Sequence, residues 1–395
     1  MTATICILSA APIWVNPRVR KEADTLLASG YDVVVGYRAD GDITRDDAIL
    51  GGKRWRWHRV DLGRERERGR WLAAALRQRG AEWLVRAGIP SIRIARAAYC
   101  RGDDEMLEWA KQQRASLYIA HTQPTLAVAA EAARASGSAF AFDCEDLLAE
   151  EAADGGRARW RRDLIVALER RFLPRAAYVS ATSEPMAAYL RDAYGLHRVP
   201  VWHNCFPAAE SAELPPPRAR PKTEVLSLAW ISATIGPGRG LEDIFSALTR
   251  VTGAFSLHLY GAVPEGASRW LADQMGRVPR DVVVHPMPAP PQVMATLSQH
   301  HLGLTLDGID CLNRSLTICN KLFLYLQAGL ACVATDTPGQ RSVLPPDAAY
   351  GAVYPPGDVA ALVAVLERFS SPAVRLAAQE AAWQIGQQRY VWEAE

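Results

Sequence analysis

A glycine-rich turn with one arginine is the segment whose residue types most directly predict chemistry. Residues 236–240 read Gly-Pro-Gly-Arg-Gly and precede a stretch with helical apolar spacing. Glycine lets the backbone approach a ligand closely, and a helix N-terminus beside a guanidinium attracts phosphate oxygens. The pattern predicts a diphosphate-binding site at Gly236, Gly238, Arg239 and Gly240. The alternative is a glycine turn that carries a surface arginine.

A second candidate cation lies further along the chain. Lys321 comes one residue into a predicted helix that begins at Asn320. It could supply positive charge to the same anion. The alternative is a lysine whose stem covers apolar surface while its charge stays in water.

Polar side chains also follow two apolar runs that have the length of strands. His121 follows residues 117–120, and Glu145 and Asp146 follow residues 139–143. Ligands bind beyond the carboxyl ends of parallel strands, so these side chains are candidate site residues. The two carboxylates could orient a hydroxyl group or cap a helix, and His121 could be satisfied within a turn.

No metal site is predicted. His300 and His301 end a predicted helix without acidic or thiol residues at ligand spacing.

The elements that must position these residues are short apolar strands separated by helices, which is typical of a parallel sheet covered on both faces. The strands predicted in the first half are Thr4–Ser9, Asp32–Gly36, Leu117–Ala120, Ala139–Asp143, Tyr178–Ala181 and Val199–Trp202. The helices between them are Thr125–Ala135, Arg157–Leu173 and Glu184–Tyr194, after a first helix that ends at Gly30.

The alternation restarts after a proline-rich stretch. The strands predicted there are Val225–Trp230, Phe255–Tyr260, Val282–His285, Leu302–Leu306, Ala331–Thr335 and Tyr350–Val353. The helices are Leu241–Thr249, Pro291–Gln299, Asn320–Gln327 and Asp358–Phe369, the last capped by Asp358. The fold class is therefore α/β, with two Rossmann-like doubly wound domains that face a cleft. We expect domains at 1–206 and 222–375, joined by a linker at 207–221.

Composition excludes several classes of protein. The 395 residues suit two domains, and no apolar run is long enough to span a membrane. A net charge of +2 does not favour nucleic acid as a partner. The seven cysteines are scattered without C-x-x-C spacing, and the N-terminus lacks the pattern of a secretory signal. We therefore expect a cytoplasmic protein with free thiols.

Charge is concentrated in residues 53–101. This segment holds thirteen arginines and Lys53 against four acidic residues, a balance of 14 − 4 = +10, interleaved with apolar side chains at partly helical spacing. Such a surface could contact an anionic membrane peripherally. The alternative is a pair of solvated helices whose arginine stems cover an apolar core.

Seven motifs, in order over nearly the whole chain, resemble those of the retaining glycosyltransferases of family four, which have the GT-B fold. They are Asn16-Pro-Arg-Val-Arg-Lys-Glu-Ala, His121-Thr-Gln-Pro-Thr-Leu, Phe142-Asp-Cys-Glu-Asp-Leu, Val201-Trp-His-Asn204, Gly236-Pro-Gly-Arg-Gly-Leu-Glu-Asp, Asn320-Lys-Leu-Phe-Leu-Tyr-Leu-Gln-Ala-Gly and Tyr390-Val-Trp-Glu-Ala-Glu.

The resemblance implies transfer of a sugar, with retention and without metal or cofactor, from a nucleoside diphosphate sugar. UDP and GDP are the expected nucleotides, and the acceptor is a carbohydrate, a lipid-linked molecule or a small molecule. His121, Arg239 and Lys321 are implied to be catalytic, and Ser315, Thr317 and Asn320 to join the glycine turn in binding the donor. Asn16, Arg18, Glu145 and Asp146 are implied to bind the acceptor, and a helix at about 376–395 to cross back to the first domain.

The chain departs from the family pattern at three donor-binding positions. Leu316 and Leu324 stand where members often carry Glu-x7-Glu, and Thr234 stands where many carry an arginine. A non-catalytic partner that binds a sugar nucleotide, or a sugar-nucleotide epimerase, is therefore an alternative on the same fold. A dinucleotide oxidoreductase is not favoured, because the turn after the first strand lacks G-x-G-x-x-G.

Overall fold

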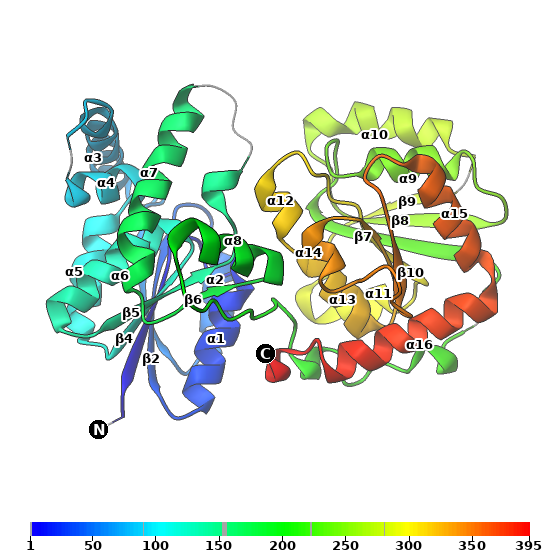
Figure 1. Ribbon diagram of the computed structural model, residues 1–395, viewed down its shortest axis with the longest axis horizontal. Helices are drawn as coiled ribbons and strands as arrows, with labels where there is room; N and C mark the ends of the chain where they lie inside the picture. The colour runs from blue at the N-terminus through cyan, green and yellow to red at the C-terminus, as the bar shows by residue number, and fades with distance from the viewer. Residues whose placement is uncertain (1, 90, 152–155, 222, 280) are drawn as a thin grey trace. The chain divides into compact units, whose positions relative to one another are not determined.

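The computed structural model describes residues 2–89, 91–151, 156–221, 223–279 and 281–395. Its contacts divide the chain into two compact units, shown in Figure 1. The first unit holds Met1–Thr182 and Met186–Val201, and the second holds Ser183–Pro185 and Trp202–Glu395.

The first unit is built on a six-stranded parallel sheet in the order β3-β2-β1-β4-β5-β6. This is the strand order of the Rossmann fold. The strands are β1 (Thr4–Ser9), β2 (Asp32–Ala39), β3 (Arg56–Asp61), β4 (Leu117–His121), β5 (Ala139–Cys144) and β6 (Val179–Ala181). The helices are α1 (Pro17–Ala28), α2 (Thr44–Leu50), α3 (Arg68–Arg86), α4 (Ile92–Tyr99), α5 (Asp103–Gln113), α6 (Gln123–Ser136), α7 (Gly156–Phe172) and α8 (Glu184–Tyr194).

Helices cover both faces of this sheet, as the continuous apolar strands predict. Alternate residues such as Ile5, Ile7, Val33 and Val35 pack with Val19 of α1 in one buried cluster. Helices α5 and α6 contact the opposite face, and α4 and α7 pack on α6 (Figure 1). The sheet and these helices hold the carboxyl ends of the strands in place.

The second unit repeats the same topology, with the order β12-β11-β10-β7-β8-β9 and parallel pairing throughout. Its strands are β7 (Leu226–Thr234), β8 (Phe255–Ala262), β9 (Asp281–His285), β10 (Leu302–Thr305), β11 (Ala331–Thr335) and β12 (Gly351–Tyr354). Its helices are α9 (Leu241–Leu248), α10 (Glu265–Arg277), α11 (Val293–Leu297), α12 (Leu312–Leu316), α13 (Asn320–Ala328), α14 (Pro338–Arg341), α15 (Val359–Ser370) and α16 (Pro372–Gln388).

Two buried clusters flank this second sheet. One joins it to α9, α10 and α15, and the other joins it to α11 and α13. Asp358 caps α15 as predicted, because its side chain accepts a hydrogen bond from the Ala361 amide at 2.9 Å.

The predicted fold class of two Rossmann-like doubly wound domains is confirmed, whereas the expected cleft stays a prediction. Strand β3 and helices α2, α5, α10, α12 and α14 have no counterpart in the sequence prediction. The predicted strand Val199–Trp202 is wrong. Only Val201 forms an isolated bridge there, to Ala181, since Pro200 has no amide hydrogen to donate to a ladder.

Within the second unit, α16 contacts α13, β11 and α15, and a Cβ at Gly386 would lie 2.4 Å from the backbone of Leu326. Glycine at that position permits this close approach. The expected crossing of residues 376–395 back to the first domain stays a prediction. Residues 207–221 contain two short 3₁₀ turns, Ala208–Glu210 and Pro217–Ala219, and the latter packs on α16.

Candidate functional site

His121 lies where the first sheet reverses its strand order. It is the last residue of β4, and it pairs with Ser9 at the end of the neighbouring strand β1. Open α/β sheets bind ligands beyond this point. Thr122, the next residue, has φ 65° and ψ 154°. A β-branched residue rarely adopts positive φ, and such strain is found most often at functional sites.

Carboxylates contact both ring nitrogens of His121. Nε2 lies 2.5 Å from Oε2 of Glu22, and Nδ1 lies 3.0 Å from Oε1 of Glu145. Nδ1 also lies 3.3 Å from Oδ2 of Asp143. The imidazole is fully buried. With both nitrogens donating, the ring is a cation held between two carboxylates.

This environment raises the pKa of His121 to about 10. Burial alone would lower the pKa, because it disfavours the charged ring. The nearby Glu22, Glu145 and Asp143 outweigh that effect.

A second buried ion pair supports the first. Arg18 of α1 donates from Nε to Oδ2 of Asp143 at 2.5 Å and from Nη2 to Oδ1 at 2.9 Å. Ser180 of β6 donates to the same Oδ1 at 2.6 Å. Burial would raise the pKa of Asp143, but Arg18 and then His121 hold it well below its ordinary value. The bidentate pair fixes α1 against the end of β5.

Asn16 joins this cluster to the start of α1. Its Oδ1 accepts from the amides of Arg18 and Val19 as the helix N-cap, and its Nδ2 donates to Oε1 of Glu145 at 2.7 Å. The side chain of Glu145 is 15% exposed and that of Glu22 is 17% exposed, whereas His121 and Arg18 are buried. Glu22 and Glu145 are therefore the most accessible side chains of the cluster.

The structure thus brings together four of the predicted residues: Asn16, Arg18, His121 and Glu145. Asp146 is exposed, and its backbone carbonyl accepts from Nε2 of Gln123 at 2.8 Å. Sequence reasoning missed Glu22 and Asp143. The spacing of Glu22, four residues after Arg18 on one helix face, is a signal that could have found it.

Ligand atoms of His121, Asp143 and Glu145 all lie within 4.8 Å of one another, as in a metal site. The donor set does not suit a cation in this state. The ring of His121 is protonated on both nitrogens, and both oxygens of Asp143 accept from Arg18. A metal would first have to displace these protons and Arg18.

In the second unit, the glycine turn after β7 packs against the chain that leaves β10. Gly238 and Gly240 both have φ 72°. A Cβ at Gly240 would lie 1.6 Å from the carbonyl oxygen of Leu306, whereas one at Gly238 would meet nothing within 4 Å. Strands β7 and β10 are neighbours where this sheet reverses its order. The turn therefore lies at the ligand-binding point of its own sheet.

Arg239 is exposed on this turn, and its Nη1 donates to Oγ of Ser232 at 3.1 Å. The amide of Gly238 donates to Oε1 of Glu242 in the first turn of α9. A side-chain carboxylate therefore already occupies one amide of the turn. The accessible guanidinium and the remaining amides are the groups that could bind an anion.

Lys321 is buried at the start of α13. Its Nζ lies 4.0 Å from Oδ1 of Asp307 and 4.7 Å from the centre of the Trp230 ring. Both contacts hold the ammonium group in place.

The other predicted donor residues surround that helix start. Ser315 belongs to the short helix α12, where its amide donates to the carbonyl of Cys311. Thr317 follows that helix and donates from Oγ1 to the carbonyl of Asn313, and Asn320 is exposed at the first position of α13.

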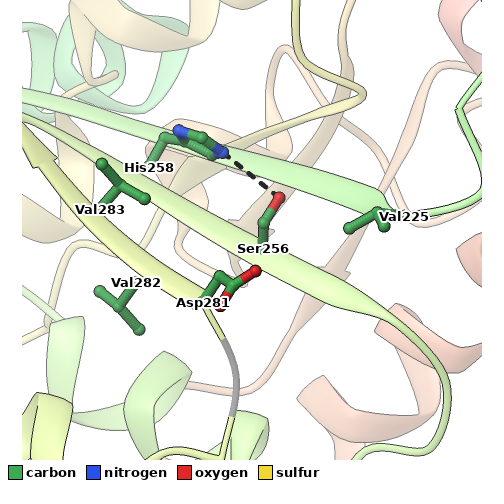
Figure 2. Close-up of a pocket in the computed structure, with 6 residues that line it drawn as sticks. All are labelled: Val225, Ser256, His258, Asp281, Val282 and Val283. Carbon is green, nitrogen blue, oxygen red and sulfur yellow. Dashed lines mark hydrogen bonds between the residues drawn. The ribbon is translucent and has the colours of Figure 1, made fainter.

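A pocket of about 500 Å³ lies elsewhere in the second unit (Figure 2). Its lining comes from the amino ends of three strands, so it lies at the opposite end of the sheet from Arg239. His258 within it accepts or donates one hydrogen bond with Ser256 at 3.3 Å. The residues that line it are Val225, Ser256, His258, Asp281, Val282 and Val283.

The first unit also carries a family match. Residues 15–205 match the glycosyl transferase 4-like domain. The match covers somewhat less than half of the chain and includes every member of the His121 cluster. A search of curated proteins found no match.

Solved structures share the fold of the whole chain, including the unit that follows the glycosyl transferase 4-like domain. HepE from Anabaena in complex with UDP matches at 16% identity and TM-score 0.69, over 100% of this chain and 96% of its own. Sucrose-phosphate synthase from Thermosynechococcus elongatus matches at 13% identity and TM-score 0.72, over 99% of this chain and 96% of its own. A glycosyltransferase from Rickettsia africae matches at 10% identity and TM-score 0.69, over 100% of this chain and 95% of its own. The fold is GT-B.

Proposed function

We propose that this protein is a glycosyltransferase that moves a sugar from a nucleoside diphosphate sugar to a hydroxyl acceptor, with retention and without a metal ion. The observation that carries the proposal is a pair of strand ends, one in each unit, at the points where the two sheets reverse their strand order. One is anionic and lies within a glycosyl transferase 4-like domain, and the other presents an exposed arginine on a glycine turn. UDP is the proposed nucleotide, because HepE was solved with UDP and with UDP-glucose.

The donor is proposed to bind the second unit. Transfer leaves a nucleoside diphosphate whose β-phosphate gains negative charge, and fixed cations and amides stabilise such charge. Arg239 would contact the diphosphate from the glycine turn, and the amino end of α9 would add its dipole. Lys321, held by Asp307 and Trp230, would be the second cation. These groups supply the positive charge that a metal provides in other transferases.

The acceptor is proposed to bind the first unit, at the exposed edges of Glu145 and Glu22. A carboxylate there could accept a hydrogen bond from an acceptor hydroxyl and orient it for attack. His121 has both nitrogens engaged, so we assign it as a positioning residue that fixes both carboxylates. A direct contact of His121 with the donor sugar, which the family resemblance implies, stays a prediction.

A second candidate function is a sugar-nucleotide-binding subunit without catalysis. Leu316 and Leu324 favour it, because leucine cannot accept the ribose hydroxyls that a glutamate would bind.

The test is binding followed by turnover. We expect UDP, among UDP, GDP, ADP, CMP and dTDP, to raise the midpoint of thermal unfolding most. Arg239→Ala should weaken UDP binding about tenfold or more, the value of a lost charge-assisted hydrogen bond. Arg250→Ala, at the opposite end of α9, removes the same charge and should not change binding.

The outcomes separate the candidates. Transfer from a UDP-sugar, with the product anomer assigned by NMR, would support the proposed reaction and test retention. UDP binding without transfer or hydrolysis would favour the non-catalytic subunit, and absence of any nucleotide shift would contradict both.

A further inference from the structure

Helix α3 carries three large apolar side chains on the outside. The exposed fractions of Leu72, Leu76 and Trp83 are 50%, 60% and 68%. Trp83 and Leu76 are the most exposed large hydrophobic residues in the part of the chain that the structure describes. Small residues, among them Ala75 and Ala81, form the buried side of the helix, which packs with α4 (Figure 1). An ordinary surface helix has the reverse arrangement.

The spacing places these side chains in one stripe. At about 100° per residue, positions 72, 76 and 83 point within about 40° of one another. Arg68, Arg79 and Arg86 lie together along one flank of this stripe, and Gly69, Ala73 and Gly80 lie along the other. The stripe with its arginine flank is called the α3 face below.

Two arginines of the α3 face have no acidic partner in the described part of the chain, and the third, Arg86, lies 4.8 Å from the centre of the Trp160 ring. Within the described residues, Arg68 and Arg79 form no ion pair, whereas Arg70 pairs with Glu105 and Arg77 with Asp104 on α5. Glu82 is the only acidic residue of α3; it lies about 40° from the direction of Arg86 on the same flank, and no ion pair joins it to the arginines there among the described residues. Apolar side chains beside unpaired arginines fit a surface that is apolar within and anionic at its boundary.

We propose that the α3 face docks on an anionic phospholipid bilayer. Leu72, Leu76 and Trp83 would enter the boundary between headgroups and acyl chains, and the arginines would contact lipid phosphates. A second copy of the chain is a poorer occupant, because a symmetric contact would bring like-charged arginine flanks together. The proposal goes beyond the proposed function. Its consequence, a lipid-linked acceptor in preference to a freely diffusing one, rests on that function.

The experiment is flotation of the full chain with vesicles. We expect binding to vesicles of phosphatidylglycerol and phosphatidylcholine in equal parts, weak binding to phosphatidylcholine alone, and release by high salt. The double variant Leu76→Ser/Trp83→Ser should bind the mixed vesicles about tenfold more weakly or worse. Arg68→Gln/Arg79→Gln should also weaken binding.

Matched control variants remove the same kinds of exposed side chain, two apolar and two arginine, from the second unit. Met287→Ser/Val374→Ser deletes two exposed apolar side chains, and Arg250→Gln/Arg277→Gln deletes two exposed charges. Both should float as the wild type does. Circular dichroism and the thermal midpoint verify that each variant is folded.

Three results would overturn the proposal. The first is that the wild type binds neither vesicle, and the second is that Leu76→Ser/Trp83→Ser binds the mixed vesicles as well as the wild type does. The third is that vesicle binding is absent while light scattering shows a wild-type dimer that this variant abolishes. UDP binding is measured on the same samples. Vesicle binding without UDP binding would contradict the proposed function and leave the docking surface standing.

Discussion

The charge state of His121 follows from three carboxylates that reach it from one strand end and a helix. Glu22 comes from α1, and Asp143 and Glu145 come from the end of β5. Arg18 neutralises Asp143, so Glu22 and Glu145 are the partners that require a cation. A neutral imidazole would leave these partly buried carboxylates without a compensating charge, which is costly.

The raised pKa of His121 predicts a pH dependence of stability. The ordinary pKa is 6.5, and the folded value is about 10. The stabilisation from the charged ring is therefore complete below pH 6.5 and is lost as the pH rises through 10. His121→Gln lacks this titrating group. As the pH rises from 6.5 to 10, the difference in free energy of unfolding between the wild type and this variant should therefore shrink, by up to about 1.4 kcal/mol per pH unit.

Urea unfolding at a series of pH values measures the difference between the two proteins. Other titrating groups are common to both and cancel. A difference that stays constant from pH 7 to pH 10 would show that the ring is neutral in the folded protein.

At the scale of elements, the turn before α9 depends on two glycines that differ in what surrounds them. Both have positive φ, but only Gly240 lies against the backbone of Leu306. The turn therefore connects the end of β7 to the chain leaving β10. Its conformation positions Arg239 and the amino end of α9.

We expect Gly238→Ala to cost about 1 kcal/mol, the usual price of a left-handed conformation without glycine. Gly240→Ala should cost clearly more, because the added Cβ cannot fit unless the backbone of Leu306 moves. Thermal unfolding compares the two variants, and UDP binding should fall only in Gly240→Ala. Equal losses of stability would mean that the packing of this turn on Leu306 is not maintained in solution.

At the scale of the whole molecule, chemistry is divided between two copies of one topology. The first unit has a cationic ring among carboxylates, and the second has an exposed arginine on a glycine turn. The described helices include none that is long and apolar enough to cross a bilayer. The α3 face is the feature proposed for membrane contact.

This division predicts where a nucleotide protects the backbone. Under the proposed function, hydrogen exchange measured by mass spectrometry with UDP should slow in peptides that contain residues 232–242 and 307–321. Peptides from 16–22 and 117–146 should be unchanged by UDP alone. Protection confined to the first unit would place the nucleotide on the wrong domain and contradict the assignment of Arg239.

Local signals in the sequence sufficed for much of the fold. Apolar runs of four to six residues located eleven of the twelve strands, since a strand buried on both faces needs apolar residues throughout. Asp358 and the glycines at 236–240 marked helix starts. Strand β3 was missed because Arg56, Trp57 and His58 lie at the edge of the sheet, where burial does not demand an apolar run.

The sequence by itself determined the two doubly wound units and the individual candidates Asn16, Arg18, His121, Glu145 and Arg239, because periodicity and turn chemistry are local. Tertiary structure decided how these residues are used. It joined Asp143 to Arg18, 125 residues away, and enclosed His121 between Glu22 and Glu145. It also turned the apolar stripe of α3 toward solvent. Such pairings depend on which strand ends and helix faces the topology brings together, so they cannot be predicted from the local spacing of residues.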